Sequence, residues 1–118
     1  MKYLCLVYHQ EAEIDALPGS EYDAIVNEVL EYREDLRQGG HYITSSPLQF
    51  VQAATTIRVR NGAMSITDGP FAETKEQLGG FYLIEARDLN EAIRLAARMP
   101  PARIGCIEVR PLKEFDPR

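Results

Sequence analysis

Strand and helix signals follow one another along this 118-residue chain in the order strand, helix, strand, hairpin, strand, helix, strand. This order predicts an α+β fold of the ferredoxin-like, split-βαβ type, with an inserted β-hairpin and both helices on one face of the sheet. The composition agrees, because 45% hydrophobic and 26% charged residues are typical of a soluble globular protein. We therefore expect one domain over residues 1–118.

The first strand and the first helix have clear sequence signals. Residues 2–8 are almost continuously apolar, which is typical of a buried strand. A polar loop is expected over residues 10–19, and Ser20 then begins a helix with the spacing of a capping box. The glycine pair at 39–40 ends this helix. One mostly apolar stripe runs along it, formed by Tyr22, Ile25, Val26, Val29, Arg33 and Leu36.

A hairpin is predicted in the middle of the chain. Asn61 and Gly62 form the strongest short hairpin signal, so residues 55–60 pair with residues 63–68. A two-residue turn fixes the register, and the same register puts Asp68 on the apolar side of the hairpin, toward the side expected to be buried. That side carries Ile57, Val59, Met64 and Ile66.

The remaining elements complete the sheet and its second helix. Short strands are predicted at residues 41–46, 81–86 and 104–110. Asp88 caps the second helix, with Glu91 three positions later as the partner carboxylate. The packing face of this helix is expected to consist of Leu89, Ala92, Ile93, Ala96 and Ala97.

Both faces of the first strand are apolar. Tyr3, Cys5 and Val7 alternate with Leu4, Leu6 and Tyr8. Two helices can cover only one face of such a sheet, and the other face would be a large exposed apolar patch. We therefore predict a homodimer in which two sheets pack face to face. The alternative is a monomer whose loops cover the second face.

Several classes of protein are disfavoured. A formal net charge of -5 opposes binding to nucleic acid. No apolar stretch approaches the roughly 20 residues of a membrane span, and the N-terminal segment lacks the features of a signal peptide. Cys5 and Cys106 are too few and too far apart for a zinc motif, so we expect buried, inert thiols in a cytoplasmic protein. No metal, nucleic acid or membrane partner is therefore expected.

One segment is dense in charged groups beside a single phenylalanine. It reads Asp68-Gly69-Pro70-Phe71-Ala72-Glu73-Thr74-Lys75-Glu76 and is followed closely by Gly79-Gly80-Phe81-Tyr82. Together with residues 1–3, 55–62 and 107–111, this segment resembles the YCII-related (YciI-like, or DGPF-domain) family over essentially the whole chain. The glycine pair 79–80 lacks the phosphate-loop patterns, and close backbone approach or a bulge is expected there.

The resemblance implies a dimeric α/β-barrel of ferredoxin-like subunits, and it implies no settled activity. Members are suspected to be small-molecule enzymes with clefts beside the dimer interface, and some are encoded beside extracytoplasmic-function sigma factors. The wider set is associated with a His–Asp pair whose histidine lies near the first helix. Residues 20–38 contain no histidine, so this mechanism cannot be carried over.

The charged segment supplies the candidate catalytic residues. Asp68 lies at a strand end beside Phe71 and would act as an acid or base, or would accept hydrogen bonds from the following backbone amides. Glu73, Thr74 and Lys75 would grip a polar ligand and move a proton, or would fix the loop through local hydrogen bonds and ion pairs.

Candidate ligand-binding residues come from the aromatic and histidine side chains. Four aromatic residues are expected to line a mostly apolar pocket, although such aromatics are more often core and interface, namely Phe71, Phe81, Tyr82 and Tyr8. His9 and His41 stand at strand ends, where each is either a surface histidine or a general base.

Two functional hypotheses follow. The first is an enzyme without a cofactor, in which Asp68, Glu73 and Lys75 perform acid–base chemistry on a small molecule near the dimer interface. The alternative is a non-catalytic ligand-binding or regulatory module that uses the same cleft, linked to an extracytoplasmic-function sigma factor. In a third interpretation, the charged segment only clamps the hairpin to the sheet.

Overall fold

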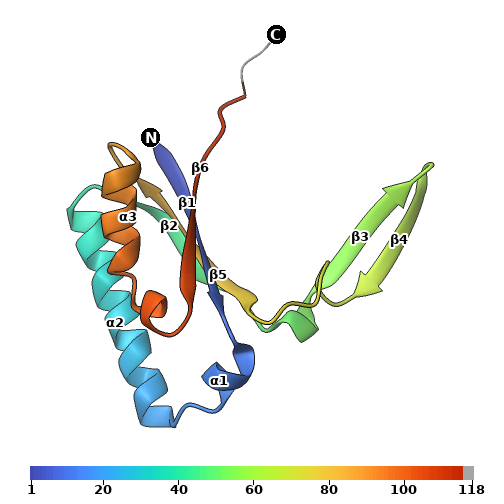
Figure 1. Cartoon of the computed structure of the whole chain (residues 1–118), viewed down its shortest axis with the longest axis horizontal. Coiled ribbons are helices and arrows are strands. Elements are labelled where there is room, and N and C mark those ends of the chain that lie inside the picture. The colour runs from blue at the N-terminus through green and yellow to red at the C-terminus, as the bar shows by residue number, and fades with distance from the viewer. Residues whose placement is uncertain (116–118) are drawn as a thin grey trace.

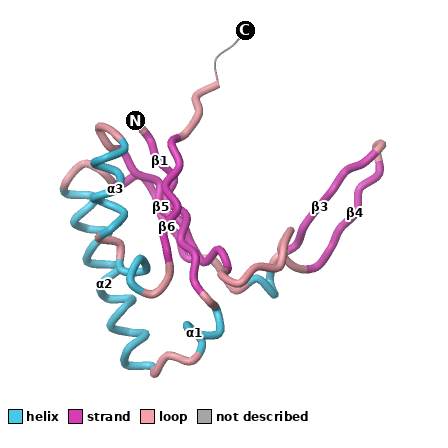
Figure 2. Tube along the Cα trace, viewed as in Figure 1, coloured by secondary structure: helices cyan, strands magenta, loops and turns pink. Residues whose placement is uncertain are grey.

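The computed structural model describes residues 1–115, which form a sheet covered by helices on one face and a hairpin that stands apart (Figures 1 and 2). The main sheet has the order β2-β5-β1-β6, and all neighbouring strands are antiparallel. Its strands are β1 (Lys2–His9), β2 (Tyr42–Pro47), β5 (Gln77–Glu85) and β6 (Cys106–Pro111). The hairpin consists of β3 (Thr55–Arg60) and β4 (Ala63–Asp68). The predicted mixed α+β fold is confirmed.

Three α-helices and two short 3-10 helices connect these strands. They are α1 (Glu11–Asp15), α2 (Gly19–Gln38), α3 (Leu89–Ala97), η1 (Val51–Ala53) and η2 (Pro100–Arg103). Helices α2 and α3 lie on the same face of the sheet (Figure 1). None of the helices within residues 1–115 is long and apolar enough to span a membrane.

The ends of the helices confirm some of the predicted caps and correct others. Gly40 has a φ of 79°, and the His41 amide donates to the Leu36 carbonyl over 2.8 Å, which is a Schellman end for α2. The predicted cap at Ser20 is wrong, because α2 already begins at Gly19, and residues 11–15 of the expected loop form α1. Asp88 caps α3 as predicted, since its carboxylate accepts from the Glu91 amide over 2.9 Å. The Glu91 carboxylate accepts from the Arg87 amide.

The strand bounds also shift where backbones lie close together. Strand β5 begins at Gln77 and runs through the glycine pair 79–80, whereas its predicted start was residue 81. Strand β6 begins at Cys106, because η2 and Gly105 precede it. A Cβ atom on Gly105 would lie 1.9 Å from the Tyr8 carbonyl oxygen, so this position tolerates only glycine.

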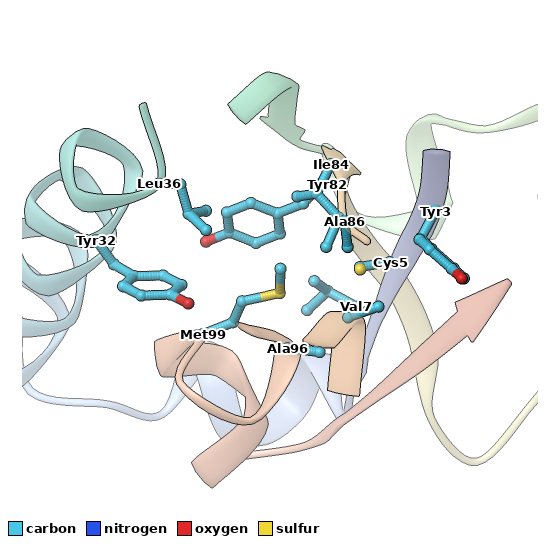
Figure 3. Packing of buried hydrophobic residues seen from close by; sticks show 11 residues of the cluster. Tyr3, Cys5, Val7, Tyr32, Leu36, Tyr82, Ile84, Ala86, Ala96 and Met99 are labelled. Atoms are coloured by element: carbon cyan, nitrogen blue, oxygen red, sulfur yellow. The ribbon is translucent and has the colours of Figure 1, made fainter. Parts of the chain in front are cut away.

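The hydrophobic core lies between the helices and the main sheet (Figure 3). It consists of Tyr3, Cys5, Val7, Tyr32, Leu36, Tyr82, Ile84, Ala86, Ala92, Ala96 and Met99. Helix α2 contributes only from its C-terminal half. In its N-terminal half, Tyr22 and Val26 of the apolar stripe remain 49% and 37% exposed, and Leu30 further along the helix is 49% exposed. The first half of α2 therefore leaves open space between itself and the sheet.

The hairpin has the predicted register and an unexpected environment. Thr55 pairs with Asp68, and Asn61 and Gly62 both have positive φ, as a type I′ turn requires. The hairpin projects from the body of the chain, so neither of its sides is buried (Figure 1). The prediction that Asp68 points to a buried side is therefore not met within one chain. Its apolar side chains are between 58% and 63% exposed, namely Ile57, Val59, Met64 and Ile66.

The two cysteines differ in environment. Cys5 points into the core, whereas Cys106 is exposed, so the prediction of burial is wrong for Cys106. Cys106 pairs with Tyr8, and this register places both residues on the sheet face that α2 and α3 leave uncovered. Strand alternation explains the difference, since neighbouring residues of a strand point to opposite faces.

Alkaline pH is expected to destabilise the chain through its buried acids. Burial raises the pKa of Cys5 from 9.0 to about 11 and the pKa of Tyr82 from 10.0 to about 12. At pH values well below 9, both the folded and the unfolded chain keep these protons. Between pH 9 and 11 the unfolded chain releases the Cys5 proton first, so the free energy of unfolding falls by about 2 to 3 kcal/mol from Cys5. Urea denaturation as a function of pH measures this fall.

The cysteine contribution has a matched control. Cys5→Ala is expected to flatten the stability profile between pH 9 and 11, whereas Cys106→Ala keeps the slope of the wild type, because Cys106 is exposed. Equal slopes in the wild type and Cys5→Ala would contradict the assignment.

Candidate functional site

A cavity of about 340 Å³ lies between the first half of α2 and the sheet, and part of its boundary is open to solvent. This volume is within the range of small-molecule sites. Most of the lining is apolar and comes from α1, α2, the segment 45–50 and the ends of β1 and β5. The lining residues are Val7, His9, Ile14, Leu17, Tyr22, Ile25, Val26, Val29, Leu30, Arg33, Ser45, Ser46, Pro47, Leu48, Phe50, Gly79, Gly80, Phe81, Tyr82, Pro101 and Ile104.

Two nitrogen-bearing side chains stand out in this apolar lining. His9 Nδ1 and Arg33 Nε are buried, and neither has a hydrogen-bond partner among residues 1–115. An unsatisfied buried polar group costs about 1–3 kcal/mol, and such groups are rare in folded proteins. Both side chains belong to the lining of the same cavity.

A β-bulge positions His9. Val7 pairs with Gly80 but Tyr8 pairs with Leu78, so Gly79 is the extra residue of β5. A Cβ atom on Gly79 would lie 2.1 Å from His9 Nε2, which means that the imidazole rests directly on the Gly79 backbone. The close approach and the bulge predicted at the glycine pair are both confirmed.

Arg33 comes from the C-terminal half of α2. No carboxylate of residues 1–115 forms an ion pair with it. Its charge acts on Tyr82, because the guanidinium opposes the rise in pKa that burial imposes on the Tyr82 hydroxyl. With a pKa of about 12, Tyr82 keeps its proton at neutral pH and remains a hydrogen-bond donor in the cavity wall.

Hydrogen bonds tie the cavity walls together on the α1 side. The Gln77 carboxamide oxygen accepts from the Glu11 amide over 2.9 Å, and the Glu11 carboxylate accepts from the Val51 amide over 2.9 Å. The Gln77 amide group also donates to the Thr74 carbonyl over 2.6 Å. Helix α1, η1 and the charged segment are thereby fixed to the start of β5.

The structure brings together three of the predicted site residues. His9, Phe81 and Tyr82 line the cavity, and Tyr8 is half-buried without lining it. Phe71 is 80% exposed, although it had been expected in a pocket wall. The other predicted residues are exposed and lie outside the cavity lining, namely Asp68, Glu73, Thr74 and Lys75.

The charged segment begins at the base of the hairpin, where hydrogen bonds hold its glycine. The Gly69 amide donates to the Ala54 carbonyl over 2.7 Å, and Thr56 Oγ1 donates to the Gly69 carbonyl over 2.8 Å. Gly69 has a φ of 109°, which suits only glycine. Within residues 1–115, the Asp68 carboxylate takes part in no hydrogen bond or ion pair, so its predicted roles stay predictions.

His41 lies outside the cavity lining. Its Nδ1 is 2.8 Å from the Glu85 carbonyl oxygen and 4.0 Å from the Glu91 carboxylate. This environment suits the strand-end histidine of the sequence interpretation. No group of three or more potential metal ligands occurs in the described part of the chain.

Arg33 was missed as a functional residue from the sequence. It was placed in the apolar stripe of α2, where a charged side chain at a packing position is itself a signal. Its importance depends on the divergence of α2 from the sheet, which periodicity does not reveal.

Comparisons with known proteins agree with this fold. A family model described as the YCII-related domain matches residues 1–116. An uncharacterised protein of Rhizobium meliloti (strain 1021) is 35% identical over 119 positions, covering 99% of this chain and 96% of that protein. The structure of TftG from Burkholderia phenoliruptrix AC1100, a 5-chloro-2-hydroxyhydroquinone dehydrochlorinase in complex with 2,5-dihydroxybenzoquinone, is similar with a TM-score of 0.56 and 16% identity. That similarity covers 98% of this chain and 96% of the TftG chain.

Proposed function

Because the chain belongs to the YCII-related family, we propose that it is a small-molecule enzyme that performs acid–base chemistry, without a cofactor, in the cavity between α2 and the sheet. One observation carries the proposal: the His9 imidazole lies in an apolar cavity wall, and its buried Nδ1 has no hydrogen-bond partner within residues 1–115. Imidazole is the side chain best suited to accept and return a proton near neutral pH. The fold similarity to TftG, whose name describes chemistry on a small aromatic compound, supports the same class of function.

The cavity assigns different roles to His9 and Tyr82. His9 would exchange a proton with the bound molecule, since one of its nitrogens is free of protein partners. Tyr82 would donate a hydrogen bond, because its raised pKa of about 12 keeps it protonated. The apolar walls would exclude water from the reacting atoms and strengthen the electrostatic interactions there.

We further propose that two ferredoxin-like subunits form a homodimer. The strand order supports the ferredoxin-like topology, and the sheet face without α2 and α3 carries apolar Leu4, Leu6 and Leu83. The Cα radius of gyration is 16.5 Å, compared with about 13 to 14 Å for a compact domain of this length. A second copy that covers the open face and the projecting hairpin would account for both features.

Paired substitutions test where the chemistry takes place. A panel of small phenols, quinones and organic acids would be screened by thermal shift, and each stabilising compound would be followed for conversion. For a converted compound, His9→Gln is expected to lower kcat by about 100-fold or more with little change in binding, because it removes the proton-transfer group. Asp68→Asn is expected to leave kcat nearly unchanged, since Asp68 lies outside the cavity.

The opposite response of the two variants would place the chemistry outside the cavity. Loss of turnover in Asp68→Asn with full activity in His9→Gln would favour the charged segment, with Glu73 and Lys75 as its other candidate residues. A compound that binds the wild type but is never converted would favour the ligand-binding alternative.

A further inference from the structure

We propose that the cavity selects small organic monoanions with an apolar body, and that Arg33 binds the anionic group. This inference deepens the proposed function and rests on the same cavity. It follows from the charge distribution of the lining, from the environment of Arg33 compared with the other arginines, and from the shape of the guanidinium group.

The cavity is positive inside an acidic protein. The chain contains 18 aspartates and glutamates and has a formal net charge of -5, yet none of the lining residues is acidic. Arg33 supplies the fixed positive charge, and His9 supplies a group that gains charge on protonation. Asp15 contributes to an adjoining hollow and not to the cavity itself. An anion is therefore attracted to the positive charge of this cavity, whereas the surrounding acidic surface repels it.

Arg33 differs from every other arginine of the described chain. It is half-buried, whereas the remaining arginines within residues 1–115 are exposed. Arg37, one turn later on α2, pairs with Glu34 and stacks on Tyr42 at 4.8 Å from the ring centroid. Arg87 likewise pairs with Glu91 over 3.1 Å. A half-buried guanidinium without a carboxylate costs stability, and an anionic ligand would supply the missing partner.

The chemistry of the two groups narrows the ligand class. A guanidinium binds a carboxylate or a similar planar oxyanion through parallel hydrogen bonds, and within residues 1–115 no ion pair occupies the Arg33 guanidinium. Arg33 is the one fixed cation of the lining, so a second negative charge on the ligand would have no further fixed cation to pair with. The remaining lining, including Ile25, Val29 and Phe50, fits an aromatic or aliphatic body.

Matched probe pairs test this selection by isothermal titration calorimetry. The probes are benzoate with benzamide and phenylacetate with phenylacetamide, because each pair has nearly the same shape and differs in charge. The wild type is expected to bind at least one carboxylate at least tenfold more tightly than its amide. Arg33→Gln should abolish this preference, and Arg37→Gln, which removes the same charge outside the cavity, should keep it. Amides that bind as tightly as carboxylates, or no binding of any carboxylate, would overturn the proposal.

Stability separates a binding role of Arg33 from a structural one. Arg33→Gln is expected to have a thermal midpoint equal to or above that of the wild type, because the variant removes a buried charge without a partner. Arg33→Lys keeps the positive charge but loses the planar guanidinium that can form two parallel hydrogen bonds, so it should show an intermediate preference for carboxylates. A lower midpoint for Arg33→Gln together with an unchanged carboxylate preference would overturn the proposal.

The two proposals fail in different ways. Carboxylates that bind through Arg33 without conversion would refute the enzyme and keep the anion site. Turnover of neutral compounds that depends on His9 and is unaffected by Arg33→Gln would refute the anion site and keep the enzyme.

Discussion

Replacing Gly79 with alanine is expected to lower turnover in the cavity by about 100-fold while leaving the chain folded. The new Cβ atom would lie 2.1 Å from His9 Nε2 and 2.4 Å from His9 Cε1, so the imidazole must move. The obstructed atoms are at the end of a side chain that can rotate away, and the cost to stability should therefore stay near 1 kcal/mol. Displacement of a catalytic group by about 1 Å can cost roughly 100-fold in rate. Steady-state kinetics and urea denaturation measure the two effects.

Gly19 provides the matched control for this substitution. A Cβ atom there would have no neighbour within 4 Å, and Gly19 begins α2, where alanine is a good helix former. Gly19→Ala should therefore keep full activity and at least the stability of the wild type. The double variant His9→Gln/Gly79→Ala should be no less active than His9→Gln alone, because both changes act through one side chain. Full activity in Gly79→Ala would refute the role given to His9.

A charge on the apolar side of the hairpin is expected to dissociate the proposed dimer. Ile66 is 59% exposed within one chain, and it would be buried by a second copy. Ile66→Asp would then bury a carboxylate without a partner, at a cost of about 2 kcal/mol or more, which weakens association by roughly 30-fold or more. Sedimentation velocity across a concentration series measures the dissociation constant.

Ser65→Asp is the control for this experiment. Ser65 is the neighbouring residue of β4 and pairs with Arg58 on the opposite, polar side of the hairpin. The same charge added there should leave association intact. A wild-type chain that remains monomeric at micromolar concentration would refute the dimer. Equal dissociation constants for the two variants would show that the hairpin is not part of the interface.

The sequence predicted best those features that short-range rules determine. Asn61 and Gly62 fix the hairpin register through their own backbone conformations, and every predicted pair of the hairpin is present. Gly40 ends α2 for the same reason, because a left-handed residue is required there. The cap at Ser20 failed because the preceding Pro18 and Gly19 already start the helix, which moves Ser20 inside it.

The candidate site was predicted less well because it depends on contacts between distant segments. From the sequence, His9 is either a surface histidine or a site residue, and nothing near it in the sequence reveals that Gly79 would support its ring. Arg33 lines the cavity only because the first part of α2 lies away from the sheet, and the sequence does not show this. The charged segment 68–76 attracted the prediction through its composition, yet its side chains lie outside the cavity lining. Composition alone cannot separate a segment that borders a site from one that fills it.

The bulge at Gly79 also reverses the parity of β5. After the bulge, even-numbered residues such as Gly80 and Tyr82 share the core face with Val7 and Cys5. Before it, Gln77 pairs with His9 and Leu78 with Tyr8, so the odd-numbered residue is the one on the cavity side. Gln77 can hold Glu11 at the start of α1 only because of this reversal. A regular ladder of the same length would pair Gly79 with Tyr8 and Leu78 with His9, and Gln77 would then turn away from α1. The bulge itself therefore determines whether the cavity keeps this wall.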